Sequence, residues 1–239
     1  GNESRTPLKG IRAVTDNTQT AYRRAMNKLL LTLLITFAGP PAMAQPTLNS
    51  AVAAYQRGDM MQARSGFLQL SAKGVPAADY NLAVMHLKRE MPAASDAEAL
   101  RLMTRAADAG FVTAMVGMAE LHELGQAGLK VDLAQSVLWS RRAAEAGSVD
   151  AQVDVATAHY LGRGAAKDVA LAARWYRLAA QRGDVGAMFI TASFYESGEG
   201  VERDLAEARY WYAAAARNGE PGADLKVKEL DAKRTKPAS

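Results

Sequence analysis

Residues 198–219, GEGVERDLAEARYWYAAAARNG, contain every part of a pattern that returns along the chain. Asp204 is followed by the aromatic Trp211, then by Ala215 and Ala216, and finally by Gly219. An aspartate suits the start of a helix, because its carboxylate can accept a bond from a free backbone N–H of the first turn. A glycine suits the residue after the last turn, where the left-handed conformation is cheapest without a Cβ. The stretch therefore predicts one helix with a marked start and end.

The same pattern recurs about every 36 residues, and the glycines are spaced by 36, 37, 36 and 36 residues. A further alanine, soon after each glycine, marks the start of another helix, which is the first helix of the next repeat. The recurring positions are Gly74, Gly110, Gly147, Gly183 and Gly219; Asp96, Asp132, Asp168 and Asp204; Trp139, Trp175 and Trp211; and Ala78, Ala114, Ala151, Ala187 and Ala223. A fixed period of this length is typical of repeat architectures.

Each repeat therefore reads as helix, turn, helix, turn, and its two helices bury an apolar face only by stacking on neighbouring repeats. The tryptophan and the alanine pair share one helical face, so we expect the three tryptophans to fill the core alike. Asp204 and Glu207 have the spacing of a capping box. We expect an all-α solenoid with helices at 76–88, 96–109, 112–124, 132–146, 149–161, 168–182, 185–197 and 204–218.

The domain organisation follows from the repeats. Residues 45–75 are predicted to form an opening helical pair, residues 76–220 four repeats, and residues 221–239 a capping helix near 222–232 with a basic tail. Residues 1–25 are polar and precede Met26, so we expect a disordered upstream extension that takes no part in the fold.

Residues 26–44 have the three parts of a secretory signal peptide. Lys28 supplies the positive start, an apolar run covers 29–37, and Ala42-Met43-Ala44 offers a small-residue cleavage site. A transmembrane anchor is the alternative, but it needs about 20 apolar residues. Arg23-Arg24 raises the option of twin-arginine export, which the weakly apolar residues behind the pair disfavour. We expect cleavage after Ala44, no transmembrane anchor afterwards, and a periplasmic or secreted protein.

The charge balance argues against a nucleic-acid partner. Of 29 Lys and Arg residues six lie in residues 1–44, and of 25 Asp and Glu residues two lie there, so the remainder carries 23 of each sign. A nucleic-acid-binding domain needs a basic excess. Cysteine is absent, which rules out disulfides, thiolate metal sites and a cysteine nucleophile in this sequence.

The Gly-x-Gly-Val, Asp-x-x-x-Ala-x-x-Trp-Tyr and Ala-Ala-x-x-Gly motifs resemble the Sel1-like repeat family, relatives of the tetratricopeptide repeats. The motifs are best kept at 198–219 and nearly as well at 162–183, whereas residues 87–92 depart from them. The resemblance covers about residues 76–223. It implies a right-handed α-solenoid and a role as an interaction scaffold, often in the bacterial envelope.

The three histidines, His86, His122 and His159, occupy one repeat position, where Tyr195 stands in the fourth repeat. They read either as substitutes for a structural tyrosine or as metal ligands. Stacked equivalent helices lie at least about 8–10 Å apart, so three such ligands cannot meet at one ion, and we expect no metal and no cofactor. No catalytic motif such as Gly-x-Ser-x-Gly is present, and we expect no enzymatic activity.

In the tetratricopeptide relatives the first helix of each repeat lines a concave groove. The resemblance places the groove two, six and nine residues after the recurring alanine, a stripe of helical period. These positions are Tyr80, Val84, Val116, Glu120, Glu123, Val153, Thr157, Tyr160, Phe189, Ser193 and Glu196. They mix acids with aromatic and aliphatic residues. They form either a partner-binding surface or a partly buried face with solvated acids.

The sequence thus favours a monomeric scaffold or regulator that binds a protein partner in the cell envelope. Two alternatives stay open. One is a hydrolase of cell-wall or β-lactam substrates, for which the chain offers no nucleophile. The other is a binding module of an exopolysaccharide system, with Tyr80, Tyr160 and Phe189 as an aromatic platform.

Overall fold

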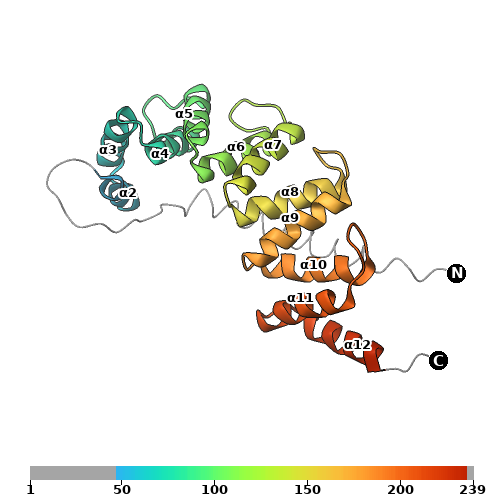
Figure 1. Ribbon diagram of the computed structural model, residues 1–239. Helices are drawn as coiled ribbons and strands as arrows, with labels where there is room; N and C mark the ends of the chain where they lie inside the picture. Colours follow the sequence, from blue (N-terminus) through green and yellow to red (C-terminus); the bar gives the residue numbers. More distant parts are fainter. Residues whose placement is uncertain (1–46, 236–239) are drawn as a thin grey trace. The chain divides into compact units, whose positions relative to one another are not determined.

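The computed structural model describes residues 47–235, which fold into an all-α repeat solenoid with eleven helices and no strand in that range (Figure 1). The expected extension, signal peptide and last residues of the tail lie outside the described part of the chain. The helices are α2 (Leu48–Gln56), α3 (Met60–Ala72), α4 (Pro76–Leu87), α5 (Asp96–Asp108), α6 (Val112–Leu124), α7 (Leu133–Glu145), α8 (Val149–Leu161), α9 (Val169–Gln181), α10 (Val185–Ser197), α11 (Leu205–Arg217) and α12 (Ala223–Thr235).

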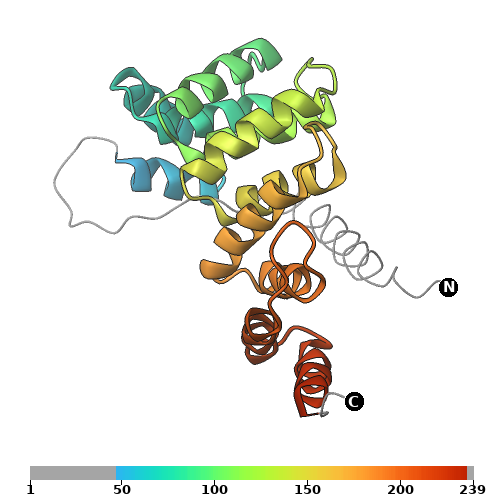
Figure 2. The same ribbon diagram turned by 45° about the vertical axis from the view of Figure 1, so that its right-hand side comes forward.

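The described helices fall into two compact units, an N-terminal unit of α2–α7 and a C-terminal unit of α8–α12. Within each unit every helix packs against the next one along the chain. Figure 2 shows this plainly for α10, α11 and α12 at the red end of the chain. The eight helices predicted between residues 76 and 218 agree with the observed ones to within one residue, and the capping helix predicted near 222–232 continues to Thr235. The predicted range 185–197, for example, is the observed range Val185–Ser197.

The aspartates start the second helix of three repeats, as predicted. Asp132, Asp168 and Asp204 each accept a bond from a backbone N–H of the first turn, over 3.0 Å at Gln135, 2.9 Å at Leu171 and 2.8 Å at Ala206. The prediction is wrong for the first repeat, where Ser95 caps α5 through the backbone N–H of Glu98.

The cause of this shift is the turn before α5. Asp96 is already helical, and its carboxylate pairs with the guanidinium of Arg89 at 2.9 Å. The other turns carry a glycine with φ of +63°, +69° or +76° after the first helix, at Gly125, Gly162 and Gly198. Arg89 occupies the corresponding position with φ of +60°. A residue with a Cβ adopts this left-handed conformation less readily than glycine does.

Only half of the predicted capping box forms at Asp204, whose carboxylate accepts a bond from the backbone N–H of Glu207 over 3.0 Å. The backbone N–H of Asp204 donates to the carbonyl of Tyr195 over 2.9 Å, so it is not left for Glu207. The Glu207 carboxylate instead accepts a bond from the indole N–H of Trp211 at 3.2 Å. The helix start is thus tied to the preceding helix of the same repeat.

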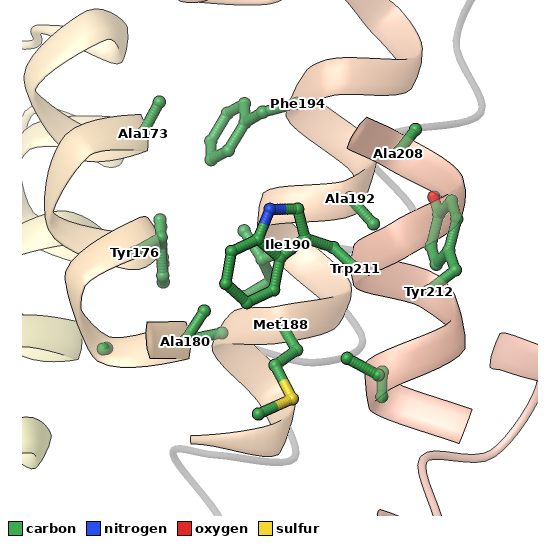
Figure 3. Packing of buried hydrophobic residues seen from close by; sticks show 14 of the residues in the cluster. Ala173, Tyr176, Ala180, Met188, Ile190, Ala192, Phe194, Ala208, Trp211 and Tyr212 are labelled. Atoms are coloured by element: carbon green, nitrogen blue, oxygen red, sulfur yellow. The ribbon is translucent and has the colours of Figure 1, made fainter. Parts of the chain in front are cut away.

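The core of the C-terminal unit is built around tyrosine more than tryptophan. Tyr176 and Tyr212, each directly after a tryptophan, are only 1% exposed, and Trp211 is 7% exposed. Figure 3 shows Tyr176 of α9, Phe194 of α10 and Trp211 of α11 gathered in one cluster. Trp175 is half-buried at the edge of the cluster.

The expectation that the three tryptophans are equivalent is therefore wrong. In the N-terminal unit Trp139 is half-buried, and the guanidinium of Arg142 lies 4.2 Å from its ring centroid. A ring stacked under an exposed arginine belongs to the surface layer. The residue after Trp139 is Ser140, which is too small to take the place of Tyr176 or Tyr212.

Candidate partner-binding surface

The predicted groove residues lie on the first helices of the four repeats, as the repeat spacing requires. We define the N-terminal row as those on α4 and α6, and the C-terminal row as those on α8 and α10. The N-terminal row comprises Tyr80, Val84, Val116, Glu120 and Glu123, and the C-terminal row comprises Val153, Thr157, Tyr160, Phe189, Ser193 and Glu196. Each row belongs to one unit and is described within it.

In the N-terminal row Tyr80 of α4 lies near α6. The rings of Tyr80 and Phe111, the residue before α6, are 5.5 Å apart. A Cβ built at Gly117 of α6 would lie 3.2 Å from the sulfur of Met103 on α5 and 3.9 Å from the ring of Tyr80, so the glycine leaves room for the Met103 side chain. All five residues of the row are half-buried, so each keeps part of its side chain open to solvent.

Glu120 is the unusual member of this row. Its carboxylate makes no hydrogen bond or ion pair to another residue of the 47–233 segment, and Glu123 lies one turn further along α6. Burial, with a smaller contribution from the charge of Glu123, raises the pKa of Glu120 to about 7. Burial also raises the pKa of Tyr80 to about 12, and the charge of Glu120 adds to that shift. A half-buried carboxylate next to another acid favours a positively charged neighbour.

Much of the C-terminal row is part of the core. Tyr160 is 3% exposed and packs edge-on against Phe194, with their ring centroids 5.8 Å apart. Val153 and Phe189 pack against the same cluster. Thr157 donates to the carbonyl of Val153 over 2.8 Å. These residues chiefly stabilise the stack of helices, which leaves little of them for a partner.

Glu196 is the polar end of the C-terminal row, and its carboxylate binds three groups of its own chain. It accepts a bond from the Tyr212 hydroxyl at 2.9 Å and pairs with Lys226 at 3.3 Å and Lys233 at 3.6 Å, both on α12. Sequence reasoning missed these lysines as site residues. The basic character of residues 226–236 could have indicated them, but it was interpreted as a basic tail.

His86, His122 and His159, which share one repeat position, each make a hydrogen-bond contact with the turn that follows their helix. The Nδ1 of His86 accepts a bond from the backbone N–H of Ser95 at 3.2 Å, and burial lowers the pKa of His86. The Nδ1 of His159 lies 3.0 Å from the carbonyl of Ala166. The main-chain carbonyl of His122 accepts from Asp132 over 2.8 Å. Within residues 47–235 no group of three or more histidine or acidic side chains is arranged to hold a metal ion.

The fold and these surfaces define a class of protein, an all-α solenoid built from helix pairs of about 36 residues. A family model described as Sel1 repeat matches residues 76–111, 112–148, 149–184 and 185–220. The chain belongs to the Sel1 repeat family, as its motifs indicate. Proteins with these repeats generally mediate protein–protein interactions, and their fold is typically a non-catalytic scaffold.

Solved structures show the same fold. A Sel1 repeat protein from Oxalobacter formigenes is 31% identical, with a TM-score of 0.63, over 71% of this chain and 49% of its own. A protective antigen of uropathogenic Escherichia coli with an SLR fold is 29% identical, with a TM-score of 0.65, over 76% of this chain and 40% of its own. The chain thus spans half or less of these two proteins. A comparison with curated proteins finds no match.

Proposed function

We propose that this protein is an exported scaffold that binds a protein partner in the cell envelope through the first helices of its repeats. The observation that carries the proposal is the N-terminal row. Tyr80 on α4 and Glu120 on α6 are half-buried, and among the described side chains the Glu120 carboxylate has no hydrogen-bond or ion-pair partner. Tyrosine is enriched in protein interfaces, and an unpaired carboxylate beside it would favour a partner of opposite charge.

Export is supported by the sequence of residues 26–44, and by the even charge balance of the chain that follows. In the part of the chain that the structure describes, no helix is both long and apolar enough to cross a membrane. We expect the processed protein to begin at Gln45 and to be a monomer. Intact mass and N-terminal sequencing of the protein from a periplasmic fraction test this. A product that keeps the apolar run 29–37 contradicts it.

A photo-crosslinking experiment tests the binding surface. Benzoylphenylalanine is placed at Val84 or Val116 in the N-terminal row, and as a matched control at Leu138 or Arg141, which are exposed on α7. Irradiation in the host cell should join the protein to the same partner from Val84 and Val116. Adducts only from α7, or none from any position, contradict binding through the first helices.

A further inference from the structure

At three places among the described residues the ammonium group of a lysine lies over a tyrosine ring. The three sets are Tyr55 with Lys88 at 5.5 Å from the ring centroid, Tyr160 with Lys167 at 5.8 Å, and Tyr212 with Lys226 at 5.9 Å. In two sets the tyrosine hydroxyl also donates to a glutamate, Glu90 at Tyr55 and Glu196 at Tyr212.

Two of these sets are fully connected by hydrogen bonds. The Tyr55 hydroxyl donates to Glu90 at 2.9 Å and accepts from Lys88 at 3.0 Å. In the set of Tyr212, the tyrosine hydroxyl donates to Glu196, whose carboxylate also pairs with Lys226. The lysine charge is thus shared between the face of an aromatic ring and a carboxylate, an arrangement that is strengthened by partial burial.

Tyr80 and Glu120 form another tyrosine–glutamate pair, because the ring of Tyr80 lies 3.9 Å from the position of a Cβ on Gly117, and Glu120 follows Gly117 by one turn of α6. The two side chains are close enough for the charge of Glu120 to raise the pKa of Tyr80, as Glu199 does for Tyr160. No lysine or arginine of residues 47–233 pairs with Glu120 or lies over the ring of Tyr80.

The C-terminal unit shows how an acid of a row can receive a lysine. Glu196 is the acid at the end of the C-terminal row, nine residues after Ala187. Its carboxylate pairs with Lys226 of α12, a helix that packs against α11. The protein itself therefore contains an example of a helix that brings a lysine to the acidic end of a row.

We propose that the surface around Tyr80 and Glu120 binds a lysine side chain of the partner, presented on a helical segment, as the C-terminal unit binds Lys226 of α12. This inference rests on the proposed function and names the chemistry of the partner. The lysine ammonium would lie against the ring of Tyr80, and its charge would be neutralised by the carboxylate of Glu120.

The test uses a lysine probe on the intact protein. N-acetyl-lysine N-methylamide is titrated at low ionic strength, and ¹H–¹⁵N NMR spectra follow the backbone signals of α4 and α6. N-acetyl-norleucine N-methylamide has the same apolar stem without the charge. We expect saturable shifts at Tyr80 and at residues 116–123 with the lysine probe and none with the norleucine probe. Glu120→Gln should weaken the binding of the lysine probe about tenfold.

The matched control is Glu145→Gln, which removes a carboxylate that pairs with Arg141 on the exposed side of α7 and should leave binding unchanged. Equal shifts with the norleucine probe would mean an apolar site, and shifts by CaCl₂ alone at these residues would mean a metal site. Either result, or no shifts at all, overturns the inference. Photo-crosslinks from Val84 and Val116 without lysine binding would leave the proposed function standing and remove only this inference.

Discussion

The hydroxyl of Tyr212 on α11 donates a hydrogen bond of 2.9 Å to the carboxylate of Glu196 on α10. This bond joins the two helices of the fourth repeat at the place where Lys226 of α12 also pairs with Glu196. Tyr212 is only 1% exposed, so its ring is held by the core while its hydroxyl fixes the acid. The last helix is thereby attached to the repeat before it.

Tyr212→Phe should lower the free energy of unfolding by about 1–2 kcal/mol, because a hydrogen bond to a charged group is lost without loss of the ring. Urea unfolding measures the change. Tyr210→Phe is the control, since Tyr210 is 57% exposed and should change stability by less than about 0.5 kcal/mol. Equal effects of the two substitutions would mean that the bond to Glu196 contributes nothing.

Tyr176→Ala should cost about 3–5 kcal/mol, as truncation of a fully buried aromatic residue does. Trp175→Ala removes a larger side chain but should cost less, because Trp175 is only half-buried at the edge of the cluster. Denaturant unfolding of both variants decides the order. A greater loss for Trp175→Ala would mean that the tryptophan carries the core.

The repeat period could be predicted because each column has a local cause. Gly183 and Gly219 end their helices with φ of +98° and +85°, a conformation that the residue type alone favours. The ranking of Tyr176 over Trp175 could not be predicted in the same way. Adjacent residues on a helix differ by about 100° in direction, so the face that meets the next repeat decides which ring is buried.

The sequence predicted which helices carry the candidate surface, but not how buried its side chains are or which groups they contact. The resemblance placed Tyr160 and Glu196 in one stripe, yet the first is in the core and the second is neutralised by α12. Both outcomes depend on contacts with other helices, which spacing along one helix does not contain. Glu120 could be selected as an acid on the stripe, but only the structure shows that no cation among the described side chains pairs with it.

The pair of Asp79 and Arg105 gives a prediction for the N-terminal unit. Asp79 is 2% exposed, and the Nε of Arg105 donates to its carboxylate at 2.5 Å. Arg105→Ala leaves a buried carboxylate without its partner, so it should destabilise the protein by about 3–5 kcal/mol. Arg142→Ala is the control, because Arg142 pairs with Asp108 on the surface and should cost less than about 1 kcal/mol. Similar costs would mean that Asp79 gains little from its partner.

Glu120 predicts a pH dependence of stability. Its pKa is raised from 4.5 to about 7 in the folded protein, next to Glu123 and Tyr80. Between these values the folded state binds more protons than the unfolded state, so stability falls as the pH rises from 4.5 through 7.

Glu120→Gln removes this titration. At a pH below the pKa of Glu120 in the unfolded chain, the variant should be as stable as the parent protein. At a pH above the pKa of Glu120 in the folded protein, the variant should be more stable by about 1–3 kcal/mol. Urea unfolding at several pH values measures the difference, with Glu145→Gln as an exposed control. A stability difference that does not grow with pH contradicts the burial of Glu120.

The central claim is that the N-terminal row binds the partner, and a charge-reversal capture experiment tests it most directly. The variant Glu120→Lys with Glu123→Lys is compared with Glu145→Lys with Glu202→Lys, an equal change of charge at exposed positions outside the rows. Both proteins are first shown by circular dichroism to be folded, and the amount of the crosslinked envelope partner that each retains is then measured. The account predicts at least about a tenfold loss with the first variant and nearly full capture with the second. Full capture by the Glu120 and Glu123 variant, with loss in the Glu145 and Glu202 variant, would contradict it.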